Sequence, residues 1–379
     1  MTRQNIAVVV GTRPEVIKMA PIVFALRDSE LYQPVLISTG QQREMLDQAF
    51  EVFGLKPDIE LGLMAPKQTL ADLTARALVA TSSALADVAP AWTLVQGDTT
   101  TAFAAGLASF YAQIPVGHVE AGLRSGRRYS PFPEELNRRM LDQLSELLFA
   151  PTMNAASQLA DEGFPASRIH TTGNTVVDAL LEIRKGLKCA PVSIPGLDES
   201  KLVGKRLVLV TAHRRESFGA PLMEMCQALV QIVRDNPEVV LVYPVHLNPN
   251  VQDPVRRILD NEDRIILLPP LGYRELVSLM ERSYIVLTDS GGIQEEAPTF
   301  GKPLLVMRDV TERPEGIEAG VARLVGTSAQ VIRHEANRLL QDAAAHRAMS
   351  GAVNPYGDGT AARMIVRLLE RSAGARKAA

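Results

Sequence analysis

Short runs of apolar residues recur along this chain, and amphipathic stretches separate them. The shortness and apolarity of the runs predict central strands of parallel sheets, buried on both faces. Strands are expected at Ile6–Val10, Val35–Ser38, Thr93–Val95, Val116–Val119, Leu207–Val210, Val239–Tyr243, Ile265–Leu268, Ile285–Leu287 and Leu304–Met307. Helices are expected between them, for example at Glu15–Asp28, Leu136–Leu148 and Tyr273–Arg282. Such alternation is typical of doubly wound α/β folds.

The chain is long enough for more than one domain, because 379 residues exceed what one hydrophobic core usually organises. Residues 186–204 lack periodicity and are rich in Pro, Gly and Ser, which indicates a connection. On either side of it, NIAVVVGTRPEVIK and RLVLVTAHRRESFG each run from a strand through a basic loop into a helix. We predict two Rossmann-like domains, 1–185 and 200–358, facing a central cleft, with a helix at 361–372 packed back on the first domain.

The composition excludes several classes of protein. A formal net charge of −3 provides no general basic field for nucleic acid or a membrane surface. Two cysteines, Cys189 and Cys226, cannot form a disulfide framework, and no spaced Cys/His set predicts a metal site. The longest uncharged stretch, Thr99–Val119, is interrupted by Gly106 and Pro115, which argues against a membrane span. We expect a cytoplasmic protein without a metal, nucleic-acid or membrane partner.

The first expected strand is followed by a helix that has basic residues near its N-terminus. In GTRPEVIK, Pro14 suits a first helical position, and Arg13 and Lys18 place two cations beside a helix N-terminus. A helix N-terminus with two nearby cations is suited to binding a pyrophosphate. The simpler alternative is that Arg13 and Lys18 are solvated surface charges. Neither GxGxxG nor GxxxxGK[ST] is present, so the usual pattern for a tightly bound dinucleotide is missing.

Three acidic residues in the first half are candidates for acid/base chemistry. Asp98 follows a strand in VQGDTTTAF, and Glu120 follows one in HVEAGLRSG. Glu134 opens a predicted helix in PFPEELNRRM and stands four residues before Arg138. Together the three would supply proton-transfer groups within one domain. The simpler alternatives are that Asp98 is a helix N-cap and that Glu134 and Arg138 form a stabilising i, i+4 pair.

The second half places histidines and a further cation after strands. His213, in TAHRRE, and His246, in YPVHLNP, each follow an apolar run and are expected to point toward the cleft. Arg313, in TERPEG, follows another strand on the same side, with an ion pair to Glu312 or Glu315 as the alternative.

A glycine-rich turn precedes two adjacent glutamates in TDSGGIQEEAP. Ser290, Gly291 and Gly292 let the backbone approach a phosphate at a helix start. Glu295 and Glu296 diverge by about 100° on a helix, so they cannot act together on one substrate atom. The stretch therefore predicts a binding element rather than a pair of catalytic carboxylates.

The joint order of these motifs resembles the non-hydrolysing UDP-N-acetylglucosamine 2-epimerase family over nearly the whole chain. The matching stretches are GTRPE-IKMAP, QGDTT-A, HVEAGLRS, PFPEE-NR, GNTVVD, TAHRRE, YPVH-NP, TDSGGIQEEAP, GKP and TERPE. The resemblance implies a two-domain fold of the glycosyltransferase-B type. It also implies interconversion of UDP-N-acetylglucosamine and UDP-N-acetylmannosamine without a cofactor, by elimination of UDP to a 2-acetamidoglucal and re-addition.

The resemblance also implies roles for individual residues. Asp98, Glu120 and Glu134 match the acid/base positions, with Arg138 and His213 nearby. The UDP-binding positions are Arg13, Lys18, Ser290, Gly291, Gly292 and Arg313, with Glu296 at the ribose hydroxyls. Gln41 and His246 match a region where some members bind a second, regulatory nucleotide sugar. A homodimer and a role in surface polysaccharide synthesis are family expectations.

Three other functions remain open on the sequence. A glycosyltransferase would share the fold and the UDP site but would need an acceptor. A hydrolysing epimerase would release free N-acetylmannosamine. A non-catalytic nucleotide-sugar binding protein would have no use for Asp98, Glu120 and Glu134, so their presence together favours an enzyme.

Overall fold

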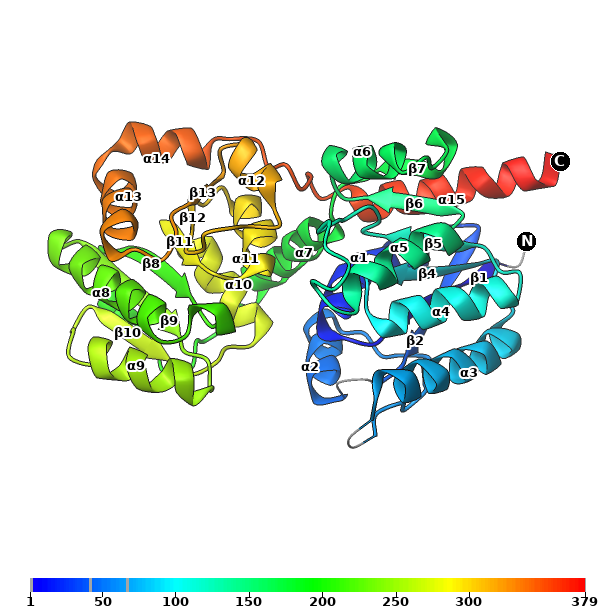
Figure 1. Cartoon of the computed structure of the whole chain (residues 1–379), viewed down its shortest axis with the longest axis horizontal. Helices are drawn as coiled ribbons and strands as arrows, with labels where there is room; N and C mark the ends of the chain where they lie inside the picture. The colour runs from blue at the N-terminus through cyan, green and yellow to red at the C-terminus, as the bar shows by residue number, and fades with distance from the viewer. Residues whose placement is uncertain (1–2, 41–42, 66–67, 379) are drawn as a thin grey trace. The chain divides into compact units, whose positions relative to one another are not determined.

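The computed structural model describes residues 3–40, 43–65 and 68–378, which form two compact units. Unit 1 consists of Met1–Glu182 and Tyr356–Ala379, and unit 2 of Ile183–Pro355 (Figure 1). The predicted domains, 1–185 and 200–358, differ from these units mainly at residues 186–199. That segment belongs to unit 2, where Ile194 is buried in the hydrophobic core.

Unit 1 is built on a parallel sheet with the strand order β3-β2-β1-β4-β5-β6-β7 among the described residues. Its strands are β1 (Gln4–Val10), β2 (Tyr32–Ser38), β3 (Ile59–Glu60), β4 (Trp92–Gln96), β5 (Val116–Val119), β6 (Leu147–Ala150) and β7 (Ile169–Thr171). Its helices are α1 (Arg13–Arg27), α2 (Arg43–Phe53), α3 (Leu70–Val88), α4 (Thr100–Tyr111), α5 (Glu134–Leu144), α6 (Met153–Asp161) and α15 (Ala361–Ala378). Helix α7 (Thr175–Cys189) continues across the boundary into unit 2.

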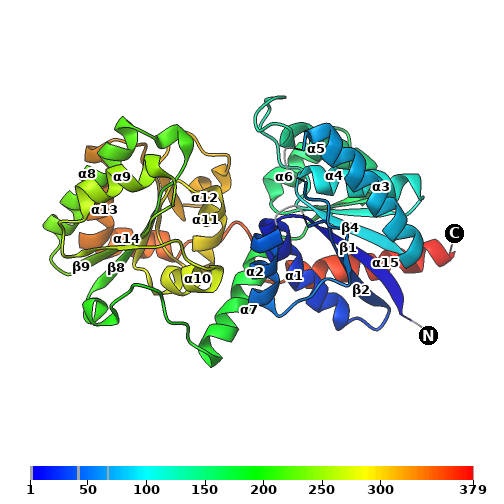
Figure 2. The same ribbon diagram turned by 90° about the horizontal axis from the view of Figure 1, so that it is seen from below.

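The helices of unit 1 cover both faces of its sheet. Figure 2 shows α1, α2 and α15 on one side of the sheet and α3, α4 and α5 on the other, and two separate hydrophobic clusters fill these layers. The C-terminal helix α15 buries Ile365 and Leu369 in the same cluster as α1. The last segment of the chain therefore completes the core of the unit that the first segment begins.

Unit 2 repeats this plan with the strand order β10-β9-β8-β11-β12-β13, also parallel. Its strands are β8 (Arg206–Thr211), β9 (Val239–Pro244), β10 (Ile265–Leu268), β11 (Ile285–Thr288), β12 (Leu304–Val306) and β13 (Ala322–Leu324). Helices α8 (Ala220–Asp235), α9 (Pro249–Leu259), α13 (Ala329–Gln341) and α14 (Ala343–Ser350) cover one face. Helices α10 (Tyr273–Arg282), α11 (Gly291–Glu296) and α12 (Pro314–Glu318) cover the other.

Each sheet has a switch point, where the strand order reverses direction. In unit 1 it lies between β1 and β4, and in unit 2 between β8 and β11. Open α/β sheets bind ligands beyond the carboxyl ends of the strands at such points. The segments after β1, β4, β8 and β11 begin with GTRPE, GDTT, AHRRE and DSGG, which carry six of the fourteen predicted site residues.

The structure corrects several predicted elements. The helix expected at Leu136–Leu148 ends at Leu144, and Leu147–Ala150 forms β6. A short leucine-rich run has no periodicity that separates a strand from a helix end, which explains the error. The expected connection begins later than Gly186, because α7 runs to Cys189 and one glycine does not end a helix. The last helix is longer than predicted, and no described helix is both long and apolar enough to cross a bilayer.

Replacing Leu369 by Ala tests the packing of α15 against unit 1. The side chain is fully buried, so the cavity should lower the free energy of unfolding by about 2–5 kcal/mol. Met364 on the same helix is 40% exposed, and its replacement by Ala should change stability by less than about 0.5 kcal/mol. Trp92, the single tryptophan, lies in this cluster, so its fluorescence during urea unfolding reports on unit 1. Equal effects of the two substitutions would contradict the packing.

Candidate active site

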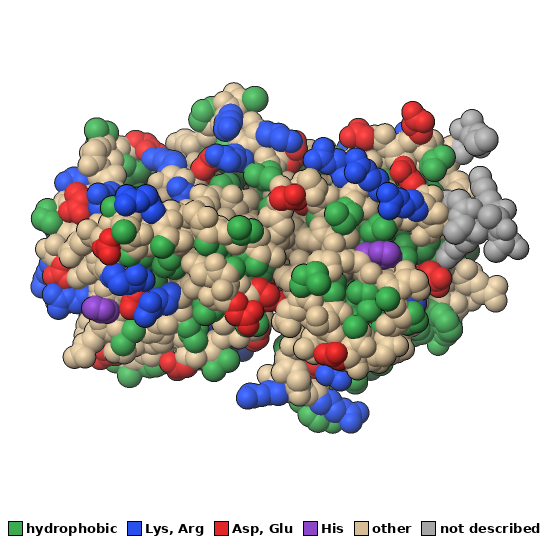
Figure 3. All heavy atoms as spheres, turned by 90° about the horizontal axis from the view of Figure 1, so that it is seen from above, with side chains coloured by type: hydrophobic (Ala, Val, Ile, Leu, Met, Phe, Trp, Pro, Cys, Tyr) green, Lys and Arg blue, Asp and Glu red, His purple; other side chains and the backbone are tan. Residues whose placement is uncertain are grey.

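The face of the protein drawn in Figure 3 carries both basic and acidic side chains, with apolar ones among them. The formal net charge is −3. An anionic ligand therefore has to be held by a local group of cations. Such groups occur at the switch points of both units.

Asp98 lies at the switch point of unit 1, held by residues of α5. It follows β4 after Gly97, whose φ of 72° turns the chain away from the sheet. The Asp98 carboxylate is ion-paired with Arg138, and its backbone carbonyl accepts a hydrogen bond of 3.0 Å from Asn137 Nδ2. Thr99, not Asp98, is the N-cap of α4, which rules out the N-cap alternative for Asp98.

Glu120 follows the neighbouring strand β5 and faces a cation. Lys18 Nζ lies 2.7 Å from each oxygen of the Glu120 carboxylate, and Gln96 Nε2 also donates to this group. Glu120 has a φ of 70°, which is unusual for a residue with a side chain and is often found at functional sites. The structure thus joins Lys18, a predicted UDP-binding residue, to a predicted acid/base residue. Gln96 was not predicted as a site residue.

The third predicted carboxylate, Glu134, begins α5 and is half-buried. The sequence alternative was an i, i+4 ion pair between Glu134 and Arg138. In the structure Arg138 instead pairs with Asp98, and its Nη1 lies 3.5 Å from the Glu135 carboxylate. Glu135 is the buried glutamate of this helix, and it accepts a hydrogen bond of 2.9 Å from the backbone N–H of Ser125.

Two further predicted site residues belong to unit 1. Arg13 is the first residue of α1. Gln41 lies outside the residues that the structure describes.

The glycine-rich turn of unit 2 carries two guanidinium groups. Ser290 is the N-cap of α11, and Gly291 begins the helix. A methyl group added at Gly291 would lie 3.1 Å from Cζ of Arg313 and 3.3 Å from Nη2 of Arg214, so both guanidinium groups lie close to this turn. Two cations beside backbone N–H groups form a cluster suited to a diphosphate. Arg214 was not among the predicted binding residues, although its place next to His213 in TAHRRE was a signal.

The two adjacent glutamates of unit 2 have different partners. Glu295 is buried and accepts a hydrogen bond of 2.8 Å from Arg313 Nε, and Glu312 lies 3.0 Å from Arg313 Nη1. Glu296 instead accepts a hydrogen bond of 3.1 Å from the hydroxyl group of Tyr273. Glu295 orients a cation of the cluster, and Glu296 lies near an aromatic hydroxyl that sequence reasoning did not identify.

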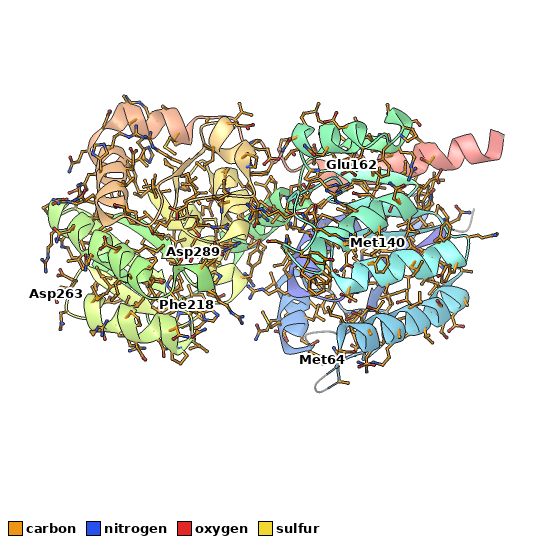
Figure 4. All side chains as sticks on the ribbon, viewed as in Figure 1. Met64, Met140, Glu162, Phe218, Asp263 and Asp289 are labelled. Atoms are coloured by element: carbon orange, nitrogen blue, oxygen red, sulfur yellow. The ribbon has the colours of Figure 1, made fainter. Side chains whose placement is uncertain are left out.

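His213 lies at the end of β8 in a loop that a buried carboxylate organises. Asp289, labelled in Figure 4, is fully buried, and its Oδ2 accepts hydrogen bonds of 2.8 Å from the backbone N–H groups of His213 and Arg214. The His213 ring stacks on His246 with 5.7 Å between the ring centroids. Partial burial of the ring lowers the pKa of His213. The Asp289 carboxylate opposes this shift in the pKa, and the charges of His246 and Arg214 add to it.

No group of three or more His, Cys, Asp or Glu side chains in the described part of the chain has the arrangement of a metal site. The carboxylates at the two switch points are arranged with Lys, Arg and backbone N–H groups instead.

The lowered pKa of His213 can be checked by NMR. The C–H signals of His213 in the ligand-free protein should titrate below the midpoint of an unperturbed histidine, since burial disfavours the imidazolium form. UDP, the ligand that the sequence predicts, should raise this midpoint if it binds beside His213, because a nearby phosphate favours the charged ring. Replacing His246 by Gln should also raise it, as one cause of the lowering is removed. A midpoint unaffected by UDP would place the nucleotide away from His213.

Replacing Gly291 by Ala tests the guanidinium cluster. The added methyl group should shift Arg214 and Arg313 and weaken UDP binding by about 10–100-fold, the value of about one charged hydrogen bond. At Gly292 an added methyl group meets no atom closer than 3.9 Å, so Gly292→Ala should leave both cations in place. Isothermal titration calorimetry with UDP compares the two variants. An equal loss at Gly292 would show that the methyl group crowds the ligand rather than the guanidinium groups.

Known proteins match this chain over nearly its whole length. The family model described as UDP-N-acetylglucosamine 2-epimerase matches residues 25–370. The UDP-N-acetylglucosamine 2-epimerases of Yersinia pestis and Escherichia coli K12 are 49% and 48% identical to this chain, and each match covers 97% of it and 98% or 99% of the relative. A crystal structure of UDP-GlcNAc 2-epimerase from Neisseria meningitidis bound to UDP-GlcNAc is 40% identical, with a TM-score of 0.86 over 97% of this chain and all of that one. The chain therefore belongs to the UDP-N-acetylglucosamine 2-epimerase family.

Proposed function

We propose that this protein interconverts UDP-N-acetylglucosamine and UDP-N-acetylmannosamine by eliminating UDP to a 2-acetamidoglucal and adding it back. The observation that carries this proposal is the pair of carboxylates on neighbouring strands, Asp98 after β4 and Glu120 after β5, each held by a cation. Inversion at C2 needs a group that removes a proton from one face of the sugar and a group that returns it to the other.

The proposed elimination moves one proton and one leaving group. The C2–H bond is a weak acid, because no carbonyl group adjoins C2 on the ring. A carboxylate takes the C2 proton while the C1–O bond to UDP breaks, and the C–H electrons form the C1=C2 double bond. In the reverse step a proton reaches C2 on the opposite face, and a UDP oxygen forms the C1–O bond again. Electrons and protons balance, so the proposed cycle consumes no co-substrate.

In unit 1, Asp98, Glu120 and Glu134 are proposed as the acid/base groups. Arg138 orients the Asp98 carboxylate, and Lys18 orients the Glu120 carboxylate. Negative charge near the sugar also favours the positive charge that grows at C1 as UDP departs. The same ion pairs keep the carboxylates in defined positions before the substrate binds.

In unit 2, the guanidinium groups of Arg214 and Arg313 are proposed to hold the diphosphate of UDP with the backbone N–H groups of Ser290, Gly291 and Gly292. Their positive charge stabilises UDP as a leaving group and keeps it bound until the proton has returned. His213 adds a hydrogen bond or a positive charge, and Glu296 accepts hydrogen bonds from the ribose hydroxyls. Arg13 and Lys18, in unit 1, are the other residues that the family resemblance predicts to bind UDP.

Several finer expectations belong to the same proposal. Family membership favours a cytoplasmic homodimer that supplies precursors for surface polysaccharides. His246, whose ring stacks on His213, is proposed to contact a second, regulatory nucleotide sugar. Gln41, the other residue predicted for that role, lies outside the described residues. Membership of the epimerase family argues against a glycosyltransferase, and a hydrolysing epimerase is the other alternative from the sequence. One experiment separates all three.

Incubation with UDP-N-acetylglucosamine in D2O, followed by NMR, tests the reaction. Both intact UDP-sugars should acquire deuterium at C2, because the proton removed from C2 exchanges with solvent before return. Free N-acetylmannosamine as the main product would indicate hydrolysis. Binding without exchange would leave the glycosyltransferase or a binding protein.

The variant Asp98→Asn tests the proposed role of the Asp98 carboxylate in the same experiment. It should lower the exchange rate by about 10²–10⁴-fold, the usual contribution of one acid/base group, with little change in UDP affinity. Loss of UDP binding in this variant would instead give Asp98 a structural role.

A further inference from the structure

A buried carboxylate that the proposed chemistry does not use ties together the two loops at the switch point of unit 1. Glu15, in the first turn of α1, is 2% exposed. Its Oε2 accepts hydrogen bonds of 2.7 Å from Gly11 N and 2.6 Å from Thr12 N, and Thr12 Oγ1 lies 3.0 Å away. Its Oε1 accepts a hydrogen bond of 2.6 Å from the hydroxyl group of Thr99. One carboxylate thus contacts the loop after β1 and the loop after β4.

Thr99 transmits this contact to Asp98, the residue before it. As the N-cap of α4, Thr99 accepts a hydrogen bond of 3.0 Å from Ala102 N at its hydroxyl oxygen. The hydroxyl group has one proton, and Glu15 takes it. The Thr99 side chain is therefore fixed at both its donor and its acceptor positions, which limits the freedom of the adjacent Asp98 backbone.

The strand order explains why a contact between the loops after β1 and β4 is needed. Helix α1 packs on one face of the sheet and α4 on the other, so the loops after β1 and β4 leave the switch point in opposite directions. On the α5 side, the Asp98 loop is held by His118 Nε2, which donates to Gly97 O at 2.8 Å, and by Asn137. Glu15 holds the same loop from the α1 side, across the switch point.

A carboxylate suits this position better than its neutral analogue. Burial raises the pKa of Glu15, and the hydrogen bonds from Thr99, Gly11 and Thr12 oppose that shift. All of these partners donate, and a carboxylate accepts at both oxygens. In a glutamine side chain, an NH₂ group would replace one of these oxygens and face a hydrogen-bond donor. At least one hydrogen bond would then be lost, and the buried donor would be left without an acceptor, at the full cost of its desolvation.

We propose that Glu15 is a positioning residue for the reaction, which acts through Thr99 to hold the Asp98 carboxylate in place for proton transfer at C2. The inference rests on the proposed function of Asp98. A misplacement of about 1 Å can cost about 10²-fold in rate, so the loss of this contact is large enough to measure.

The test compares Glu15→Gln, Thr99→Val and Thr99→Ser in the full-length protein. The first two should each lower kcat by about 10–100-fold. Thr99→Val, which leaves the contacts of Glu15 with Gly11 and Thr12 in place, should keep KM and UDP affinity within about threefold of the original values. Thr99→Ser keeps the hydroxyl group and should restore most of the activity. The double variant Glu15→Gln/Thr99→Val should be no worse than the poorer single variant, because both substitutions break one link.

Asp72→Asn is the control for loss of a helix cap alone. Asp72 and Thr69 form the same kind of capping box at the start of α3. The control should lower stability, measured by Trp92 fluorescence, without lowering kcat per UDP-binding site. Calorimetric stoichiometry with UDP supplies the number of binding sites, so partly unfolded protein does not distort kcat.

A primary isotope effect with C2-deuterated UDP-N-acetylglucosamine distinguishes positioning from a general structural role. In Glu15→Gln it should be at least as large as in the original protein, because the added barrier lies on proton transfer. A smaller isotope effect, or a kcat per binding site equal to that of Asp72→Asn, would overturn the inference. Absence of C2 exchange in the unmodified protein would instead overturn the proposed function, so the two failures are distinguishable.

Discussion

The switch point of a parallel sheet is the constraint on which the candidate active site depends. Adjacent helices leave it toward opposite faces, so backbone groups and side chains at the strand ends are open to a ligand. This protein has two such points, at β1/β4 and at β8/β11, and each collects charged residues from loops far apart in the sequence. The chemistry of the site follows from how these charges are paired.

Most of the acidic groups at the switch points have a defined partner. Asp98 meets Arg138, Glu120 meets Lys18, and Glu295 meets Arg313. A carboxylate removed from water is costly unless it is paired or accepts hydrogen bonds, and these contacts supply both. Asp289 shows the second solution, since two backbone N–H groups satisfy one of its oxygens. These contacts orient the charged groups in the ligand-free protein, an arrangement that suits catalysis by preorganised charges.

The two units divide the proposed work between them. Unit 1 contributes carboxylates with cationic partners, and unit 2 contributes guanidinium groups with carboxylate partners at a glycine-rich turn. An anionic leaving group and a cationic sugar need opposite electrostatic surroundings. In the proposed reaction, the carboxylates of unit 1 suit the positive charge on the sugar, and the guanidinium groups of unit 2 suit the negative charge on UDP.

The sequence by itself determined the fold class, the long strands and the loops that carry the site. Apolar runs of strand length need burial on both faces, and polar residues at their ends mark the carboxyl edge. The strands β3, β6, β7 and β13 were missed. β3, β7 and β13 each contain a polar or charged residue, Glu60, His170 or Arg323, so they form no apolar run, and β6 was assigned to the end of a predicted helix.

Only the tertiary structure decided which charges meet. Arg138 stands four residues from Glu134 yet pairs with Asp98, 40 positions away, and Lys18 pairs with Glu120, 102 positions away. The same holds for Arg214 beside Gly291 and for Glu15 with Thr99. Such pairs depend on strand order and on the direction in which each helix leaves its sheet. Spacing along the chain encodes neither, because strands adjacent in a parallel sheet are separated in sequence by whole helices.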